Sequence, residues 1–530
     1  MGTALLDLPI PIPPALLSSV KDLRLSTLLV ILVSVLLVVT RIFGSRKGKP
    51  WIRVGRSPGL LGLRSLAARM DFFKQGRAIV RDGYNKVSPI HAQGSYLHML
   101  SMHKGENFVV QTAEKEQFVI APRFLPEIRM LPETKLSHAH VLMDYWVGEH
   151  IGADIALAGA QHIDAVRGPL TKTLPTTVPI MHREYLRTSE KLFSAIPKDI
   201  RQIKAYDFCY AMISSMTSTV FIGEELTHRG GWSEIVQEYF PEAWRIRMAL
   251  KPWPKSIRPL VKPVLVRNNK LEAIIARAEA FLEEPVRKRR ESNNQDTDIL
   301  KFLADYGESP RKIGMQIVGI ITGALNTSTF ALTQAIYDLC THPEYIADIR
   351  TEARAALASE NMQWTLETCK KLHLLDSFLK ESLRLFAPEG LAITRKATSA
   401  FGLSDGTWIP EGTYIAVAGE GMARDPDFYP DPDTFDGRRF LDKNTGLPLA
   451  PEREFHGIEP GNAMWGAGRL TCPGRHFASV LSKMIIANLV LRYDISLPPG
   501  QTELRPGAEM DANLLPDMTQ MIVLTEVGSE

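Results

Sequence analysis

One cysteine, set in a glycine-rich loop just before a helix, constrains this chain more than any other feature. Residues 465–474 read WGAGRLTCPG, so Cys472 is surrounded by Gly466, Gly468 and Gly474. Apolar residues then recur with a helical spacing between positions 477 and 485. A thiol before a helix N-terminus meets free backbone N–H groups and the positive end of the helix dipole. The loop therefore predicts a site for a thiolate.

The type of metal that Cys472 would bind follows from its isolation. A single thiolate is a poor zinc site, because structural zinc takes several clustered Cys and His ligands. It suits a metal that arrives with its other ligands, as haem iron does. Glycine residues allow the backbone to approach a large, flat partner and to adopt positive φ where needed. The loop therefore indicates a haem site with one protein thiolate.

The segment resembles the haem-binding loop of the cytochrome P450 superfamily. That resemblance implies that Cys472 is the axial ligand of the iron of haem b, and that the cofactor is also held by Trp465, Gly466, Arg469 and Gly474. Where the superfamily commonly has a basic residue, this chain has Leu470. We therefore expect one propionate contact to come from Arg469 or from elsewhere.

Composition agrees with a large globular protein. The 530 residues are 45% hydrophobic, enough for a core, and the net charge of +3 is too small to argue for a nucleic-acid partner. The other cysteines, at positions 209, 340 and 369, are too widely spaced for a disulfide framework. We interpret them as buried hydrophobic residues in a reducing, cytosol-facing body.

The N-terminal region predicts a membrane anchor. Residues 25–40 read LSTLLVILVSVLLVVT without a charge, and the apolar stretch extends to residue 43. That is close to the ~20 residues that span a bilayer as a helix. Six basic residues follow it between positions 41 and 56, against two before it, which places the C-terminal part in the cytosol. We expect a luminal tail (1–24), a single transmembrane anchor (25–43), a basic, proline-containing hinge (44–60) and a haem-binding catalytic domain (61–530), in the endoplasmic reticulum membrane. A buried core helix is the alternative for the apolar stretch.

Beyond the hinge, the pattern predicts one helix-rich domain with small β-sheets, and the resemblance implies the cytochrome P450 fold. The predicted helices span 68–83, 137–157, 179–194, 208–221, 232–249, 269–290, 311–341, 343–358, 375–386 and 475–491. The predicted strands span 108–111, 117–120, 414–417 and 521–524.

A carboxylate and an arginine share one helix face at Glu381 and Arg384. Alone, the pair reads as a surface ion pair worth at most ~1 kcal/mol. About fifty residues later, residues 425–440 read DPDFYPDPDTFDGRRF. This stretch resembles the one that completes the Glu-Arg-Arg triad of the superfamily, with Arg439 as third member. Gly437 and Arg438 replace the usual Pro-Glu. The implied role is structural, because arginine binds carboxylate in a bidentate manner and can fix the loops around the haem.

Residues 318–329 read VGIITGALNTST, halfway along a predicted helix of about 30 residues. Glycine costs about 1 kcal/mol in a helix, and threonine can hydrogen-bond to a carbonyl one turn earlier. We therefore expect the helix to lose regularity here and make room for a ligand. The segment resembles the oxygen-activating groove of the superfamily, which implies that Thr327 relays protons. The superfamily often has an acid where this chain has Asn326, and an amide can hold a water but cannot carry a proton in the same way. A plain buried helix with a few hydroxyl groups is the alternative.

The resemblance also implies residues for the two haem propionates. Arg395 follows the Glu381 helix at the distance where the superfamily places a propionate-binding arginine. His162 and Arg167 resemble the fungal form of a second propionate-binding helix. The turn 389–393 and the loop near residues 514 and 515 are expected to form, with the face of 318–327, the walls of an apolar substrate site. Arg469, Arg475 and Lys483 are expected to dock an acidic reductase.

Together these motifs predict a membrane-anchored monooxygenase similar to fungal ent-kaurene oxidases and secondary-metabolite oxidases. The resemblance implies a hydrophobic substrate such as a terpenoid or prenylated scaffold, electrons from NADPH through cytochrome P450 reductase, and cytochrome b5 and membrane lipid as further partners. Desaturation, rearrangement or coupling on the same fold stays open because of Asn326. A haem- or lipid-binding protein without oxygenase activity is a further alternative, for which Leu470 is the one argument. A membrane receptor or scaffold would not explain Cys472, Glu381 and Arg439 together.

Overall fold

The computed structural model describes residues 51–57, 62–86, 106–194, 196, 201–291 and 298–528. The predicted tail (1–24) and transmembrane anchor (25–43) lie outside these residues, as does most of the predicted hinge (44–60).

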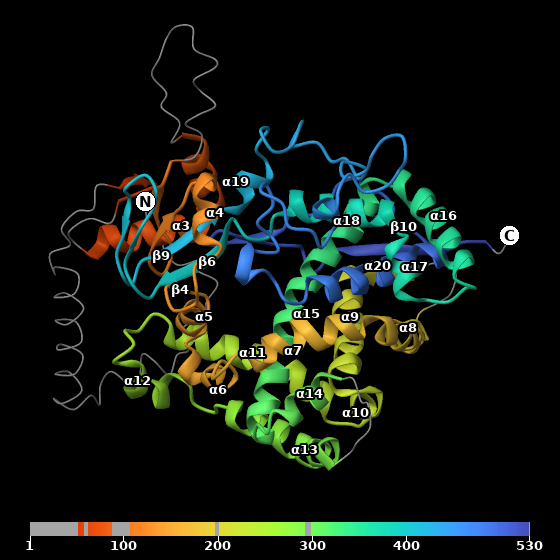
Figure 1. Ribbon diagram of the computed structural model, residues 1–530, viewed down its shortest axis with the longest axis horizontal. Coiled ribbons are helices and arrows are strands. Elements are labelled where there is room, and N and C mark those ends of the chain that lie inside the picture. Colours follow the sequence, from red (N-terminus) through yellow and green to blue (C-terminus); the bar gives the residue numbers. More distant parts are fainter. Residues whose placement is uncertain are drawn as a thin grey trace, which may run out of the picture.

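The described chain is mainly helical, as predicted (Figure 1). Its helices are α3 (Gly62–Lys86), α4 (Leu125–Ile128), α5 (Ala139–Trp146), α6 (Ala153–Ala156), α7 (Gln161–Ala165), α8 (Thr171–Phe193), α9 (Ala205–Ile222), α10 (Glu224–His228), α11 (Trp232–Leu250), α12 (Arg258–Leu265), α13 (Leu271–Glu291), α14 (Ile299–Asp305), α15 (Pro310–Thr341), α16 (Glu344–Ser359), α17 (Leu366–Lys370), α18 (His373–Phe386), α19 (Gly419–Ala423) and α20 (Arg475–Arg492).

The strands form small sheets at the edges of the helical body. They are β1 (Ile52–Val54), β2 (Phe108–Gln111), β3 (Glu116–Val119), β4 (Leu136–Ser137), β5 (Arg201–Lys204), β6 (Leu391–Ala397), β7 (Phe401–Gly402), β8 (Trp408–Ile409), β9 (Tyr414–Ala418), β10 (Tyr493–Ser496), β11 (Ala508–Met510), β12 (Asn513–Leu515) and β13 (Met521–Glu526). The largest sheet has the order β1-β2-β3-β9-β6-β4, and β10-β13-β5 form a second sheet. In Figure 1 the largest sheet lies at the upper left with α3, and helices fill the centre, the right and the lower left.

All four predicted strands are present, and most predicted helices differ from the observed ones only by small shifts of their ends. The prediction of one helix over 137–157 is wrong. Val147 adopts a left-handed φ of 50° and Gly152 has a φ of 79°, so the segment divides into α5, a short turn and α6. A left-handed residue cannot continue a right-handed helix, and a β-branched residue rarely adopts that conformation.

The predicted start of the helix at residue 179 is also wrong, because α8 begins at Thr171 and contains Pro175 and Pro179. Each proline removes one backbone donor and normally ends a helix. Here the helix persists because Leu174, Val178 and other residues of one face are buried in the core.

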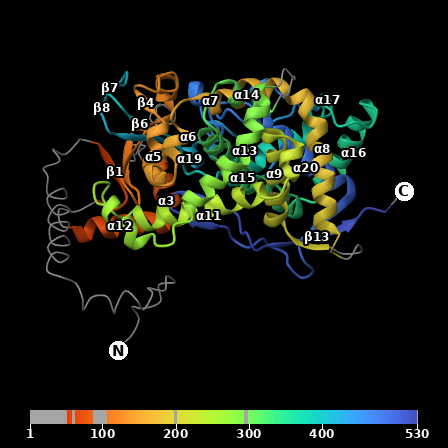
Figure 2. The ribbon, with the colours of Figure 1, turned by 90° about the horizontal axis from the view of Figure 1, so that it is seen from below.

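Helix α15 is the central element of the helical body. It packs against α9, α13 and α18, and Figures 1 and 2 both show it surrounded by other helices. Among the described residues it is also the one helix long and apolar enough to cross a membrane by length and composition. Its many buried residues, from Ile313 to Leu339, give the physical reason for its apolar composition.

Candidate active site

The cysteine loop is closed by its own backbone. The Cys472 N–H donates to the Trp465 carbonyl at 2.7 Å. Gly466 and Gly468 have φ values of 80° and 60°. A Cβ on Gly468 would lie 2.2 Å from the carbonyl oxygen of Arg129, so no larger residue fits there.

Gly474, the residue before α20, has an ordinary φ of −90°. A Cβ there would meet only a methyl group of Val166, at 3.7 Å. The packing of the chain itself therefore does not require glycine at position 474.

Two opposing effects set the charge of the Cys472 sulfur. Burial raises the pKa of the thiol above its ordinary value, whereas the N–H groups of Gly474 and Arg475 and the Arg475 charge lower it. The predicted support from the helix start is therefore present but smaller than the cost of burial. A metal cation at the sulfur would reverse this balance, because coordination deprotonates a thiol. A half-buried thiol with these donors behind it fits the role of ligand to haem iron.

Trp465 connects the cysteine loop to the segment before it. Its indole Nε1 donates to the Phe455 carbonyl at 2.6 Å, and the two rings make an edge-to-face contact at 5.4 Å. The Phe455 N–H in turn donates to Asp376 on α18 at 2.6 Å. The loop is therefore tied to the helix that carries Glu381.

Glu381, Arg384 and Arg439 meet in the structure. Arg384 donates to both carboxylate oxygens of Glu381, at 2.7 and 2.8 Å, and the Arg439 Nε donates to Oε1 at 2.9 Å. Glu381 and Arg384 have 0% exposed side chains. The alternative of a surface ion pair therefore does not apply to this pair.

The two arginines also hold backbone carbonyls far along the chain. Arg384 Nη1 donates to the carbonyls of Ala423 and Pro432 at 2.6 and 2.7 Å. Arg439 donates to carbonyls of the same loop, those of Pro430, Asp431 and Thr434. The cluster fixes the loop 423–440 on α18, and the Gly437-Arg438 departure leaves these contacts in place.

A second buried charge network lies beside the first, and the sequence motifs did not predict it. Lys483 of α20 pairs with Asp376 at 2.5 Å, and Lys380 pairs with Glu459 at 3.3 Å. Lys380 also donates to the carbonyls of Glu452 and Glu454. The expectation that Lys483 is exposed for docking is therefore wrong, since it is almost fully buried in this pair. The sequence did contain a signal for this network, because Asp376, Lys380 and Lys483 are charged residues among the buried positions of α18 and α20.

The middle of α15 presents small residues to an open space. Gly319, Gly323 and Thr327, spaced by four, are exposed although Leu325 and Thr329 beside them are buried. A Cβ on Gly323 would meet nothing within 4 Å. Close packing therefore does not require glycine at position 323, because a larger side chain would meet no other group there.

The predicted loss of helical regularity in this segment is wrong, because α15 runs without interruption from Pro310 to Thr341. Thr327 Oγ1 donates to the Gly323 carbonyl at 2.8 Å, and Asn326 Nδ2 donates to the Thr322 carbonyl at 3.0 Å. Side chains that bond back to the preceding turn satisfy themselves without opening the helix.

Arg395, on β6, is buried and lies against a histidine that the sequence did not single out. Its Nη1 donates to the Thr394 carbonyl at 2.7 Å and to His138 Nδ1 at 3.1 Å. Burial lowers the pKa of His138 to about 4 and that of Arg395 to about 10. His138 is therefore neutral, and its Nδ1 lies between the Arg395 guanidinium and the Thr394 carbonyl, which is 3.2 Å away.

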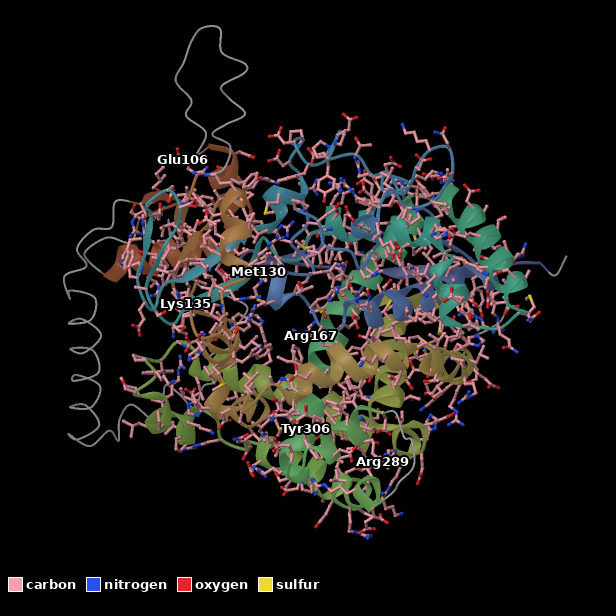
Figure 3. All side chains as sticks on the ribbon, viewed as in Figure 1. Glu106, Met130, Lys135, Arg167, Arg289 and Tyr306 are labelled. Atoms are coloured by element: carbon pink, nitrogen blue, oxygen red, sulfur yellow. The ribbon has the colours of Figure 1, made fainter. Side chains whose placement is uncertain are left out.

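Arg167 and Arg469 meet on the cysteine side of the molecule. Arg167 Nη2 donates to the Arg469 carbonyl at 3.4 Å, and both line a pocket of about 480 Å³ with Gly468, Thr471 and Arg475. Figure 3 shows Arg167 near the centre of the view. His162 is buried on α7, and its Nδ1 has no hydrogen-bond partner among the described residues. Burial lowers its pKa, so that it is neutral.

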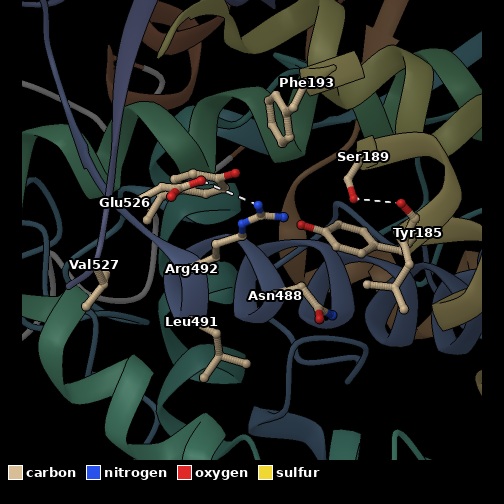
Figure 4. Close-up of a pocket in the computed structure, with 10 residues that line it drawn as sticks. Tyr185, Ser189, Phe193, Asn488, Leu491, Arg492, Glu526 and Val527 are labelled. Carbon is tan, nitrogen blue, oxygen red and sulfur yellow. Dashed lines mark hydrogen bonds and ion pairs between the residues drawn. The ribbon is translucent and has the colours of Figure 1, made fainter. Parts of the chain in front are cut away.

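A second pocket lies at the other end of α20. It measures about 400 Å³ and is bordered by the Arg492–Glu526 ion pair at 3.4 Å (Figure 4). Helix α20 has 18 residues, so its ends are about 27 Å apart at 1.5 Å per residue. This pocket is therefore remote from Cys472.

Comparison with known proteins identifies the family. The profile of the family described as Cytochrome P450 matches residues 172–523, more than half of the chain. The chain belongs to this family.

Fungal enzymes are among its relatives, and the chain matches them over most of their length. It is 27% identical to the cytochrome P450 monooxygenase AN1598 of Emericella nidulans, over 88% of this chain and 84% of the relative. It is 26% identical to an ent-kaurene oxidase of Gibberella intermedia, over 85% and 83%, and to the monooxygenase penP of Penicillium crustosum, over 94% and 95%.

Solved structures agree on the fold. The crystal structure of the cytochrome P450DA heme domain matches with a TM-score of 0.65 at 16% identity, covering 91% of this chain and 99% of that one. The retinoic acid-bound cyanobacterial CYP120A1 matches with a TM-score of 0.57 at 21% identity, covering 84% and 96%. The protein is a cytochrome P450 monooxygenase with the fold of that family, which implies a cysteine-ligated haem and a redox partner.

Proposed function

We propose that this monooxygenase oxidises a hydrophobic small molecule of terpenoid or prenylated type in fungal secondary metabolism. The observation that carries the proposal is the open stripe of Gly319, Gly323 and Thr327 in the middle of a buried helix, which leaves room for a bulky apolar scaffold. The half-buried Leu391 and Leu514 supply apolar surface on two segments that meet at the hydrogen bond from the Leu514 N–H to the Pro388 carbonyl. Relatives named ent-kaurene oxidase support a terpenoid substrate.

The residues proposed to bind the haem have different roles. Haem iron with a thiolate ligand supplies the activation of dioxygen. Cys472 provides that thiolate, Trp465 and Gly466 shape the loop around it, and the Gly474 N–H supports the sulfur. Arg395, Arg167, Arg469 and His162 are proposed to hold the propionates, the arginines by charge and the neutral His162 through its unpartnered Nδ1.

Thr327 and Asn326 are proposed to deliver protons. Thr327 Oγ1 donates to the Gly323 carbonyl, so its lone pairs stay free to accept from water in the open space, and the Asn326 amide holds a water nearby. Desaturation, rearrangement or coupling remains the second candidate, because Asn326 cannot transfer a proton as a carboxylate does.

Replacing Thr327 by alanine is expected to lower product formed per NADPH consumed by on the order of 100-fold, the lower end of what positioned proton-transfer groups contribute. Thr351→Ala is the matched control, since the Thr351 hydroxyl makes the same bond to a carbonyl one turn earlier on exposed α16. Product, NADPH and peroxide are measured in one reaction. Equal coupling in both variants would remove Thr327 from the proton path.

Electrons are proposed to come from NADPH through cytochrome P450 reductase, with cytochrome b5 as a second donor. The pocket lined by Arg167, Arg469 and Arg475 supports docking of an acidic partner on the cysteine side.

The chain is further proposed to be anchored in the endoplasmic reticulum membrane by residues 25–43, with the catalytic domain in the cytosol. Helix α12 adds a second lipid contact. It has no buried residue, Leu260 and Val264 are 68% and 62% exposed, and Lys262 lies between them. Such a basic, apolar surface suits a membrane interface.

Flotation with lipid vesicles tests this placement. The full chain is expected to float completely, and a chain lacking residues 1–43 is expected to float partly. Changing Leu260 and Val264 to aspartate in the shortened chain should abolish the remainder. A full chain that stays in the soluble fraction would contradict the anchor.

The substrate class is tested with microsomes that contain the protein and a fungal reductase. We expect NADPH-dependent conversion of a largely apolar terpenoid or prenylated compound, and a shift of the haem spin state on binding. Spin shifts confined to small polar compounds would contradict a hydrophobic substrate.

A further inference from the structure

A single carboxylate stands in the otherwise apolar turn between α18 and β6. The Glu389 side chain keeps accessible surface, although burial raises the pKa of its carboxyl. The carboxylate therefore lies close to many protein atoms without being covered by them. Among the described residues, none forms a hydrogen bond or an ion pair with this carboxylate. The one charge that lowers its pKa is the more distant Arg395.

Packing places this turn beside the cysteine loop. The Gly419 N–H donates to the Gly390 carbonyl at 3.0 Å. A Cβ on Gly419 would lie 2.7 Å from the Glu389 carbonyl oxygen and 3.1 Å from the methyl group of Met464, the residue before Trp465. The turn that carries Glu389 therefore lies close to the start of the loop that carries Cys472.

Asn513 lies directly opposite Glu389. The two residues form an antiparallel bridge. The Gly390 N–H donates to the Ala512 carbonyl at 2.8 Å, and the Leu514 N–H donates to the Pro388 carbonyl at 2.9 Å. Residues opposite each other in such a pair project to the same face, with Cβ atoms about 4.5–5.5 Å apart. The carboxylate and the amide therefore share one face.

The register of this pair is fixed. A Cβ on Gly390 would lie 2.5 Å from the Ala512 carbonyl oxygen, so only glycine allows the two segments to approach. Because side chains alternate between faces, this close contact on one side holds Glu389 and Asn513 on the other.

We propose that Glu389, supported by Asn513, anchors the substrate by accepting a hydrogen bond from a hydroxyl or a protonated nitrogen on an otherwise hydrophobic molecule. This inference rests on the proposed function. A desolvated carboxylate without a protein partner is unfavourable unless a ligand donor satisfies it. A haem propionate would repel the carboxylate, so the partner is the substrate. The substrate is therefore an apolar scaffold that already carries one polar donor.

The test is an optical titration of the purified holoenzyme with phenylimidazole and its hydroxy, methoxy and aminomethyl derivatives, each in the meta and para forms. The imidazole nitrogen of every probe coordinates the haem iron, so binding is read from the Soret band without turnover. We expect the wild type to prefer the better-placed hydroxy probe over its methoxy analogue by roughly tenfold, as for a hydrogen bond to a charged group.

Three variants decide the origin of that preference. Glu389→Leu is expected to bring the hydroxy-to-methoxy ratio of dissociation constants close to one. Glu389→Gln should keep part of the hydroxy preference and lose any aminomethyl preference, which separates a neutral donor from an ammonium group. Glu411→Gln, at an exposed turn, is the matched control and should behave as wild type.

Equal ratios in wild type and Glu389→Leu would overturn the inference. If Glu389→Leu fails to load haem, Glu389→Gln alone decides, and an unchanged aminomethyl and hydroxy preference there overturns it as well. Failure of the proposed function has a different signature, since wild type would then bind the probes with this preference and yet convert no apolar terpenoid.

Discussion

Replacing Cys472 by serine is expected to abolish monooxygenation and the long-wavelength Soret band of the reduced carbon monoxide complex. The serine hydroxyl is a far weaker acid than the thiol, and it receives only the modest support of the Gly474 and Arg475 N–H groups and the Arg475 charge. Without an anionic sulfur ligand, the push of electron density that favours O–O cleavage is lost. Turnover should fall to background, while the loop, which is closed by backbone and Trp465 contacts, keeps its shape.

Cys340→Ser is the control for this experiment. Cys340 is half-buried near the end of α15, and burial raises the pKa of its thiol to about 12, so it remains an inert thiol. The control should keep both the Soret band and the activity. A Cys472→Ser protein that retains the long-wavelength band would contradict the assignment of the axial ligand.

The features that sequence could predict are those encoded locally. The cysteine loop combines glycines and a helix start within about ten residues, and Glu381 and Arg384 share one helical turn. Arg439 was reached through the resemblance, because no local pattern connects it to a carboxylate 58 residues away. The structure brings all three together.

Other features depend on contacts between distant segments. The Lys483–Asp376 pair joins α20 to α18, and it reverses the expectation of an exposed lysine. The break at Val147 requires a left-handed β-branched residue, which only the surrounding packing can enforce.

The sequence also does not predict the Glu389–Asn513 pair. Glu389 looks like one polar residue at the edge of an apolar turn, and Asn513 lies more than a hundred residues later. The bridge between the two backbones gives them a common face, and that pairing is a property of the folded chain.

Replacing Glu381 by glutamine is expected to lower the free energy of unfolding by about 3–5 kcal/mol, the cost of leaving a buried charge without its partner. Arg384 is fully buried, and the neutral amide cannot balance its charge or accept from both arginines with the same geometry. Since a domain has only about 5–15 kcal/mol of net stability, much of the protein should fail to retain haem. Denaturant unfolding and the ratio of haem to protein measure the two effects.

The neighbouring arginine provides the control that makes this result specific. Arg438 pairs with Asp348 at the surface, where the side chains are 48% and 55% exposed, so Arg438→Ala should cost at most about 1 kcal/mol. Arg439→Ala should fall between the two variants, because Arg439 binds Glu381 through one nitrogen while Arg384 keeps its bidentate contact. If Glu381→Gln and Arg438→Ala unfold at the same denaturant concentration with equal haem content, the buried cluster does not hold the loop 423–440 on α18. We expect the loss of unfolding free energy to be largest for Glu381→Gln and smallest for Arg438→Ala, because it depends on how deeply the charge left without a partner is buried.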